Sequence, residues 1–545
     1  MNLEVPQPST SPSPPGADHE IAPQDVVVIG GGLVGASFAL LLQRRLPGRR
    51  VTLVELSETH PHRLGEATVE VSGCFLARVL GLYEHLAREH QPKHGLRYWH
   101  SDHDDRTLAE MSEVGSTELP HLPSFQLDRQ ILDEHVLAEA EAAGCEVLRP
   151  AKVTTVDTGW PTSTVEVELA DGRKRALTTR WVIDASGRRA FLARRKRLLE
   201  KVPSHPTAAV WGWWRGVKDI DAAIAEVPGA KEPGVVHLPM SRRLATNHFC
   251  GHGWWIWMIP QSDGETSLGL VYDKRLFELP GSGPKRERYE AFLRSRPGLG
   301  ELLADATFEG GSFGAYAELP YRSRRYMDRG WALVGDAASF LDPYYSPGLD
   351  HAAISINATL DLVAGDLEGT LDDDALGDEI QRHNGEFERS YDRWLEALYL
   401  DKYEILGDSE LTACAFLVDT ALYHLGVVTP IYRQDEAFTK PVFGLQLPQA
   451  RIAYKMMAAF NRRMVVLARH RRRVGTYGRR NVGRRLAGKA FGLGVRGTFN
   501  PLRRGLGLWF RLELARWTHP LRRGLGLDPP PQALASDRQP LPSRR

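Results

Sequence analysis

A glycine-rich turn near the start of the chain constrains the fold more than any other feature. Gly30, Gly32 and Gly35 have the spacing G-x-G-x-x-G between the apolar run DVVVI and a stretch with apolar residues at helical intervals, LVGASFALLLQRRL. A second apolar run, VTLVE, ends at Glu55, 20 residues after Gly35. In such a β-α-β unit the glycines let the backbone approach a pyrophosphate at a helix N-terminus, and the acidic residue accepts hydrogen bonds from a ribose. We therefore expect a Rossmann-type domain that binds a dinucleotide. A glycine turn without a ligand is the alternative.

The rest of the pattern predicts an α/β fold in which this domain is interleaved with a second sheet and followed by helices. Alternating aromatic and β-branched residues over 208–272 indicate a mixed or antiparallel sheet, and residues 386–464 have mostly helical spacing. We divide the chain into a leader with the composition of a disordered segment (1–24), an interleaved nucleotide and substrate domain (25–385), a helical region (386–450) and a C-terminal extension (451–545).

The C-terminal extension is strongly basic, although the whole chain has a formal charge of only +1. Residues 451–545 contain 23 Lys and Arg but 3 Asp and Glu, so the rest of the chain is acidic. Trp509, Phe510, Leu514 and Trp517 are interspersed with these charges. Three interpretations stay open: an amphipathic helix at an anionic membrane surface, a docking segment for an acidic carrier or other protein, and a disordered or packed tail. Nothing resembles a nucleic-acid reading module, so no specific nucleic acid is expected.

The four cysteines, Cys74, Cys145, Cys250 and Cys414, are scattered without C-x-x-C spacing. We therefore expect neither a metal site nor a disulfide framework. The N-terminus lacks the basic and apolar regions of a signal peptide. The most apolar stretch, LTACAFLVDTALYHLGVVTP, is interrupted by Asp419 and His424, so we expect a buried helix there. Together these features favour a cytoplasmic protein, peripheral on a membrane if the extension binds one.

Further motifs resemble those of the flavin monooxygenase superfamily. They are Asp184-Ala-Ser-Gly187-Arg188, Gly335-Asp336-Ala-Ala and Arg129 in the segment LDRQILDEHVL. The resemblance implies that the dinucleotide is FAD, with Asp336 near the ribityl hydroxyls, and no second G-x-G-x-x-G indicates a nicotinamide domain.

Three motifs in order resemble those of flavin-dependent halogenases of the tryptophan-halogenase-like branch. They are G-E-A-T with Glu66 and Ala67, W-x-W-x-I-P with Trp255 and Trp257, and F-x-x-P-x-x-S-x-G with Pro343, Ser346 and Gly348. The resemblance spans about residues 25–366. It implies that Glu66 and Ala67 contact the flavin, that the third motif lies on its halide side, and that the tryptophans keep substrate away from the flavin. Core packing is the alternative for the tryptophans.

A fourth resemblance concerns Lys93, which opens a K-x-G-L-x-Y segment similar to the halogenase segment that carries the catalytic lysine. It implies that Lys93 receives HOX, the oxidised halogen, through a dry path and delivers it to the substrate; burial would lower its pKa. A solvated surface lysine is the alternative. The halogenases of free tryptophan have a glutamate before the motif serine, where this chain has Tyr345. The segment is closer to that of halogenases of phenols, pyrroles and other electron-rich rings.

The function implied by these resemblances is FADH2- and O2-dependent halogenation, with chloride or bromide installed on an electron-rich aromatic or enolic carbon. A flavin reductase would supply FADH2, and the substrate would be a small molecule or tethered to a carrier. Two alternatives remain: an FAD-dependent monooxygenase or oxidoreductase on the same fold, and a non-catalytic flavoprotein-like membrane adaptor.

Overall fold

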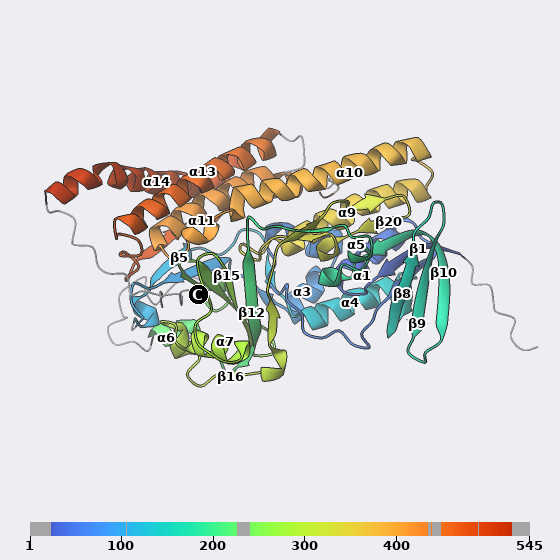
Figure 1. Ribbon diagram of the computed structural model, residues 1–545, viewed down its shortest axis with the longest axis horizontal. Helices are drawn as coiled ribbons and strands as arrows, with labels where there is room; N and C mark the ends of the chain where they lie inside the picture. The colour runs from blue at the N-terminus through green and yellow to red at the C-terminus, as the bar shows by residue number, and fades with distance from the viewer. Residues whose placement is uncertain are drawn as a thin grey trace, which may run out of the picture.

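A largely parallel sheet and a mixed sheet lie side by side, and long helices run across one side of both (Figure 1). The computed structural model describes residues 23–104, 106–225, 240–433, 438, 448–488 and 490–525. The predicted leader therefore lies almost wholly outside the described residues, as does the chain beyond 525.

The first sheet contains the predicted β-α-β unit. Its central strand β1 pairs in parallel with β2 and with β10, and Val28 lies between Leu53 and Ile183 in the register. Strands buried on both faces are mostly apolar, and in β2 Thr52 is the one polar residue. The order is β19 (Met327–Asp328), β20 (Trp331–Leu333), β10 (Lys174–Asp184), β1 (Gln24–Ile29), β2 (Val51–Val54), β7 (Glu146–Leu148), with β9 (Ser163–Leu169) and β8 (Ala151–Asp157) joined to β10 as an antiparallel extension. The predicted Rossmann-type architecture is confirmed.

The second sheet confirms the strands expected over 208–272 and adds others from distant parts of the chain. Its central four strands are antiparallel neighbours, whereas β13 pairs in parallel with β4. The order is β16 (Thr307–Phe308), β12 (Thr207–Arg215), β15 (Glu265–Asp273), β14 (Trp254–Pro260), β13 (Thr246–Gly251), β4 (Leu96–His100), β5 (Ser112–Ser116), β22 (Arg485–Gly488), with β17 (Gly314–Tyr316) beside β12. Because β22 belongs to the C-terminal extension, part of that extension is built into the body of the protein.

Two small sheets and the helices complete the described part of the fold. The small sheets are β11 (Leu199–Lys201) with β18 (Tyr321–Ser323) and β21 (Ser339–Phe340), and β3 (Gln91–Pro92) with β6 (Phe125–Gln126). The helices are α1 (Leu33–Arg45), α2 (Glu70–Cys74), α3 (Tyr83–Glu89), α4 (Arg129–Ala142), α5 (Phe191–Arg195), α6 (Ile220–Ala225), α7 (Lys285–Arg294), α8 (Leu299–Leu302), α9 (Gly348–Leu367), α10 (Asp373–Trp394), α11 (Ser409–Tyr423), α12 (Thr429–Arg433), α13 (Pro448–Arg473) and α14 (Gly494–Gly524). Helices α10, α11, α13 and α14 form the layer along the upper side in Figure 1.

The buried helix predicted around Asp419 is α11 with its continuation to α12. Ser409–Arg433 is the one helix in the described part that could cross a membrane by length and composition, and 83 % of its most apolar window is buried inside the protein. The two polar residues that interrupt it have partners. Lys402 pairs with Asp419 at 2.7 Å, and the His424 ring lies 3.2 Å from the Gly492 carbonyl oxygen. Buried polar groups with such partners suit a protein interior.

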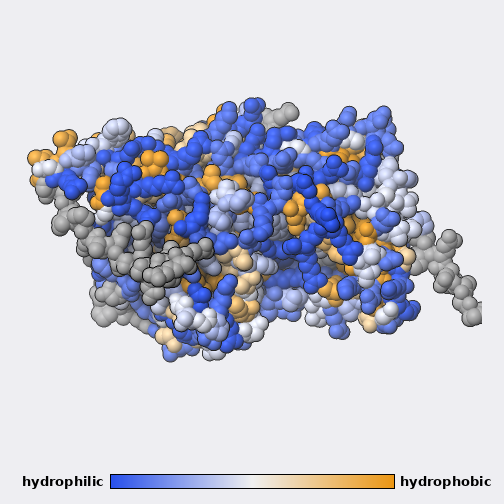
Figure 2. Space-filling view, in the orientation of Figure 1, coloured by the Kyte–Doolittle hydropathy of each residue, from blue (hydrophilic) through white to orange (hydrophobic). Residues whose placement is uncertain are grey.

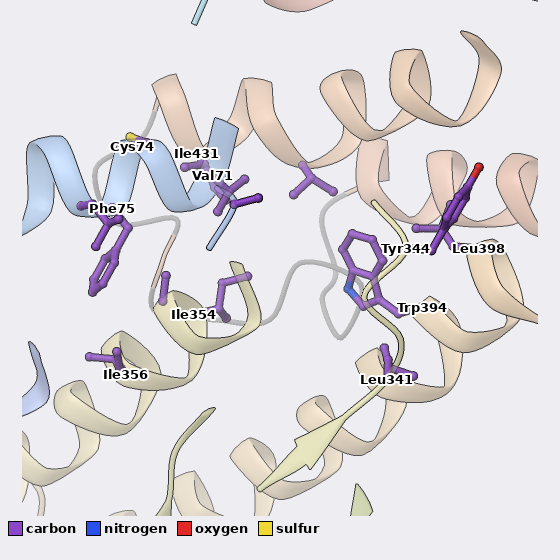
Figure 3. Packing of buried hydrophobic residues seen from close by; sticks show 14 of the residues in the cluster. Val71, Cys74, Phe75, Leu341, Tyr344, Ile354, Ile356, Trp394, Leu398 and Ile431 are labelled. Carbon is purple, nitrogen blue, oxygen red and sulfur yellow. The ribbon is translucent and has the colours of Figure 1, made fainter. Parts of the chain in front are cut away.

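The helical layer meets α9 and α2 in one apolar core. Figure 3 shows Val71 and Cys74 of α2 and Ile354 and Ile356 of α9 within this cluster, with Ile431 of α12 nearby. This packing fixes the start of α9 against the start of α2. The two cavities described next lie on either side of these two helix starts.

Candidate active site

A cleft of about 1170 Å³ opens at the carboxyl ends of β1, β2 and β10. This is where ligands bind in open α/β sheets. Of the predicted cofactor residues, the cleft is lined by Gly30, Gly32, Glu55, Glu66, Ala67, Arg129 and Asp336, together with the motif residues Trp255, Trp257, Pro343, Ser346 and Gly348. Gly35, Asp184 and Gly335 are near the cleft but do not line it.

The glycine loop has the geometry that a dinucleotide requires. Gly30 has φ +101°, and a Cβ there would lie 2.7 Å from the Ala185 carbonyl oxygen. A Cβ on Gly35 would lie 1.9 Å from the Gly30 carbonyl oxygen, so only glycine lets α1 approach β1 this closely. Gly32 is the N-cap of α1 and contributes no side chain to the cleft. The positive end of α1 is therefore accessible to an anionic group.

Glu55 is fixed at the end of β2 beside this loop. Its carboxylate accepts hydrogen bonds from the backbone N–H of Gly31 at 2.8 Å and of Ser57 at 2.9 Å. Burial alone would raise the pKa of Glu55, but these two hydrogen bonds, with His60 and Arg63 nearby, hold the pKa below its usual value. An ionised carboxylate at this position fits a ribose diol.

Arg129 and Asp336 both line the cleft, and their side chains interact electrostatically. The Arg129 guanidinium donates to Asp133 at 2.9 Å and to the Leu64 carbonyl oxygen at 2.9 Å, which fixes its position. Burial raises the pKa of Asp336, and Arg188 and Arg129 oppose that rise. The cleft thus combines donors and an acceptor suited to phosphate and hydroxyl groups.

The Asp184 side chain is buried and does not line the cleft, and its expected contact with the cofactor stays a prediction. Its carboxylate accepts hydrogen bonds from the backbone N–H of Ser186 at 3.0 Å and of Leu192 at 2.7 Å, so it holds the turn after β10. The cleft is lined instead by the residues that follow, including Arg188. Arg188 ends the motif that the sequence singles out, but it is not among the predicted cofactor residues.

The two motif tryptophans lie on one face of β14 and line the cleft, as their alternation predicts. The Trp257 indole N–H donates to the Ser267 hydroxyl at 3.0 Å, and that hydroxyl donates to Glu66 at 3.1 Å. The Trp255 indole N–H donates to the Tyr403 hydroxyl at 2.9 Å. Trp254 points to the other side of the sheet, into a separate core.

Glu66 is buried within this network. It also accepts a hydrogen bond from the Trp213 indole N–H at 3.0 Å. Burial raises the pKa of Glu66 to about 8, and the hydrogen bonds from Ser267 and Trp213 limit the rise. The G-E-A-T segment is therefore tied to the tryptophan strand, from which it is far apart in the sequence.

A second, smaller cavity lies behind the wall of the cleft, and Lys93 lines it. Two segments separate the two spaces. The first dividing segment is residues 66–70. Its residues Glu66 and Ala67 line the cleft, whereas Thr68, Val69 and Glu70 line the cavity.

The second dividing segment is the F-x-x-P-x-x-S-x-G motif and the start of α9. Pro343, Ser346, Gly348 and Leu349 line the cleft, whereas Tyr345, Pro347 and Asp350 line the cavity. Tyr345 and Ser346 have φ values of +71° and +56°, a left-handed conformation that non-glycine residues seldom adopt. Such strain is concentrated at functional sites. In this conformation Tyr345 lines the cavity and Ser346 lines the cleft.

Lys93 is buried, with 2 % of its surface exposed, so it is not a solvated surface lysine. Its ammonium donates a hydrogen bond to the Thr68 carbonyl oxygen at 2.7 Å, and its backbone N–H donates to the Ser124 carbonyl oxygen at 2.8 Å. Burial lowers the pKa of Lys93 to about 8, although the carboxylates of Glu70 and Asp350 oppose the shift. A substantial fraction of the amine is then neutral near pH 8.

Asp350 and Glu70 are site residues that sequence reasoning missed. Asp350 accepts hydrogen bonds from the Ser72 backbone N–H at 2.8 Å and from the Tyr423 hydroxyl at 2.7 Å. Burial raises the pKa of Asp350 to about 7. Asp350 could have been found in the sequence, because it is a carboxylate in the first turn of a mostly apolar helix, two residues after Gly348 of the third motif. The cavity thus holds an amine whose pKa is lowered by burial and a carboxyl group whose pKa is raised by burial.

The C-terminal extension also contributes to this cavity. Met457, Ala490 and Phe491 line it together with Lys93 and His94. Among the described residues, no group of three or more His, Cys, Asp or Glu side chains is arranged to hold a metal ion.

The fold and the cleft define a dinucleotide-binding α/β protein with a second, lysine-lined cavity behind the nucleotide site. The chain belongs to the tryptophan halogenase family, whose model matches residues 25–122 and 104–400.

Curated relatives agree with this assignment. A flavin-dependent halogenase of Dictyostelium discoideum is 27 % identical over 388 residues, which are 64 % of this chain and 61 % of that protein. The match thus spans less than two thirds of that relative's length. The 1H-pyrrole-2-carbonyl peptidyl-carrier-protein chlorinase of Pseudomonas fluorescens is 24 % identical over 401 residues, 70 % of this chain and 84 % of that protein.

A solved structure has the same fold. The crystal structure of the halogenase PltM in complex with phloroglucinol and FAD superimposes with a TM-score of 0.67 at 19 % identity, covering 83 % of this chain and 92 % of that chain.

Proposed function

We propose that this chain is an FAD-dependent halogenase that installs chloride or bromide on an electron-rich aromatic or enolic carbon. When bound in its reduced form, FAD would supply two electrons and two protons, with which O2, a halide ion and one further proton yield HOX and water. The observation that carries the proposal is the wall described above. It separates the nucleotide cleft from the cavity that contains the Lys93 amine.

The cleft residues would hold FAD in the following way. The pyrophosphate would lie against the glycine loop at the N-terminus of α1, and Glu55 would accept hydrogen bonds from the ribose. Asp336 and Arg129 would face the ribityl chain and the flavin side of the cleft. The fit rests on the close approach that Gly30 and Gly32 permit and on the fixed carboxylate of Glu55.

The halide would bind beside the strained turn. Ser346 lies in the left-handed region directly before α9, where backbone N–H groups and the helix dipole favour an anion. The indoles of Trp255 and Trp257 occupy the neighbouring wall of the cleft and would keep the organic substrate away from it.

Lys93 would act in the second cavity. Its hydrogen bond to Thr68 holds the nitrogen in place, and the lowered pKa supplies neutral amine to hold HOX or to form a chloramine or bromamine with it. The ring carbon takes the halogen, and the proton that it loses needs an acceptor. Asp350 lines the same cavity and is suited to accept this proton.

The substrate class follows from the cavity and from one relative. Aromatic side chains from several elements line the cavity, among them Tyr345, Trp394 and Phe416, which suits a flat ring. The carrier-protein chlorinase of Pseudomonas fluorescens acts on a tethered pyrrole, as its name states. We propose a small or carrier-tethered electron-rich ring as substrate, and a separate flavin reductase as the source of FADH2.

The test is to incubate the purified chain with a flavin reductase, NADH, FAD, O2 and bromide, together with phenols, pyrroles and their carrier-bound forms. Mass spectrometry should detect brominated product that depends on bromide. A hydroxylated product without bromine would instead support the monooxygenase alternative. Failure to bind FAD would support the adaptor alternative.

A further inference from the structure

The C-terminal helix α14 carries a row of exposed apolar side chains along the side that faces away from the body. Phe510 is 67 % exposed and Trp517 is 72 % exposed. The row consists of Val495, Phe499, Leu506, Phe510, Leu514, Trp517, Leu521 and Leu525. In Figure 1, α14 forms the outer left edge of the helical layer, and Figure 2 shows hydrophobic surface at the same end of the molecule.

The opposite side of the same helix is packed on the body, so the row cannot rotate inward. Gly494, Thr498, Pro501, Gly505, Leu508 and Leu512 are its buried residues. A Cβ on Gly505 would lie 2.7 Å from a methyl group of Val418, which shows how closely α14 meets α11. Helix α14 therefore has apolar residues on two opposite sides, and among the described residues only one of these sides is covered by protein. Contiguous apolar surface of this kind marks an interaction site.

Basic residues flank the row. The helix contains seven Arg and one Glu, and that Glu, Glu513, pairs with Arg463 of α13. At 3.6 residues per turn, Arg504, Arg511 and Arg522 fall on one flank of the apolar row, and Arg496 and Arg503 fall within it. Within the described ranges, Arg503, Arg504 and Arg511 make no side-chain ion pair. Their charges are available to an anionic partner.

We propose that α14 is an interfacial membrane anchor that binds an anionic phospholipid bilayer. Its apolar row would enter the boundary between head groups and acyl chains, and the flanking arginines would contact lipid phosphates. A linear apolar row over 31 residues, about 46 Å of helix, matches a flat bilayer better than the compact surface of a small carrier protein. Seven arginines and two internal prolines, Pro501 and Pro520, exclude a spanning helix.

The experiment is sedimentation of the full FAD-loaded chain with vesicles of pure phosphatidylcholine or of phosphatidylcholine with 40 % phosphatidylglycerol. Wild type should bind the anionic vesicles, and binding should weaken at least tenfold between about 50 mM and 500 mM NaCl because salt screens the arginines. The triple variant Phe510→Ser, Trp517→Ser, Leu521→Ser should bind at least tenfold more weakly. The variant Arg503→Gln, Arg504→Gln, Arg511→Gln should lose most of the preference for anionic lipid.

The matched control is Tyr83→Ser, which removes a 57 % exposed aromatic side chain from α3 and should bind like wild type. Circular dichroism establishes that every variant is folded. Because the four cysteines are buried, Phe510→Cys can be labelled selectively with an environment-sensitive dye, which should shift to the blue on anionic vesicles.

Two results would overturn the proposal. The first is no binding of wild type to any vesicle, including the case in which an acidic apo-carrier protein binds instead. The second is equal vesicle binding by wild type and the triple serine variant. Neither result depends on whether the chain halogenates anything.

Discussion

The ammonium of Lys93 donates a 2.7 Å hydrogen bond to the backbone carbonyl oxygen of Thr68, the last residue of the G-E-A-T segment. The preceding residues of that segment, Glu66 and Ala67, line the nucleotide cleft. One short stretch of chain therefore contacts both the nucleotide cleft and the buried amine. Thr68 thus holds the amine on the cavity side of the wall, and Glu66 and Ala67 form part of its cleft side.

Gly32→Val should abolish FAD binding. A Cβ added at this position would lie 2.8 Å from the Arg63 guanidinium, and a branched side chain would project into the cleft where the pyrophosphate is expected. The measurement is the flavin absorbance of the purified protein and a fluorescence titration with FAD, in which affinity should fall at least a hundredfold. Gly507→Val, on the exposed side of α14 with no atom near its Cβ, is the control and should bind FAD normally. Full flavin occupancy in Gly32→Val would be incompatible with the assigned site.

The glycine loop shows why part of this site is readable from sequence. Its strand, turn and helix are contiguous, so their spacing alone predicts the unit. The alternation of Trp255 and Trp257 likewise predicts a shared strand face because side chains alternate along a strand. Local periodicity is sufficient in both cases.

Long-range pairing is what the sequence could not provide. β22 joins β5 across about 370 residues, with Leu486 opposite Val114, and no local pattern specifies that partner. Asp350 lines the same cavity as Lys93 because α9 packs against α2. The hydrogen bond from the Ser72 backbone N–H to the Asp350 carboxylate joins these two helices. The local motif also could not show that the Asp184 carboxylate accepts hydrogen bonds from the backbone of its own turn.

Glu66→Gln should change the pH dependence of stability. The folded pKa of Glu66 is about 8, above its ordinary value of 4.5, so its contribution is present below pH 4.5 and is lost as pH rises to about 8. Relative to Glu66→Gln, the wild-type free energy of unfolding should fall by on the order of 3 kcal/mol between pH 5 and pH 8. Urea unfolding at both pH values measures this. Glu84→Gln on exposed α3 is the control. An unchanged difference between wild type and Glu66→Gln would refute the buried, protonated state.

Asp350→Asn should slow halogenation without loss of FAD. Because the pKa of Asp350 is raised to about 7, its carboxylate gains a proton as pH falls through 7, and the wild-type rate should fall with it. The variant should be 10- to 100-fold slower and should lack this acidic limb of the pH–rate profile, as expected for a general base. Asp361→Asn, at an exposed position on the same helix, is the control. A variant with the wild-type rate and the same acidic limb would exclude Asp350 as the proton acceptor.

The most direct test of the account is Lys93→Met, assayed for O2 consumption and for brominated product in the same reaction. The variant has a side chain one atom shorter and removes the nitrogen. It should bind FAD and consume O2 like wild type when FADH2 is supplied, because the nucleotide cleft lies on the other side of the wall. Brominated product should fall at least a hundredfold, whereas Lys285→Met, at an exposed position at the start of α7, should form product at the wild-type rate. Equal bromination by Lys93→Met and wild type would contradict the central claim.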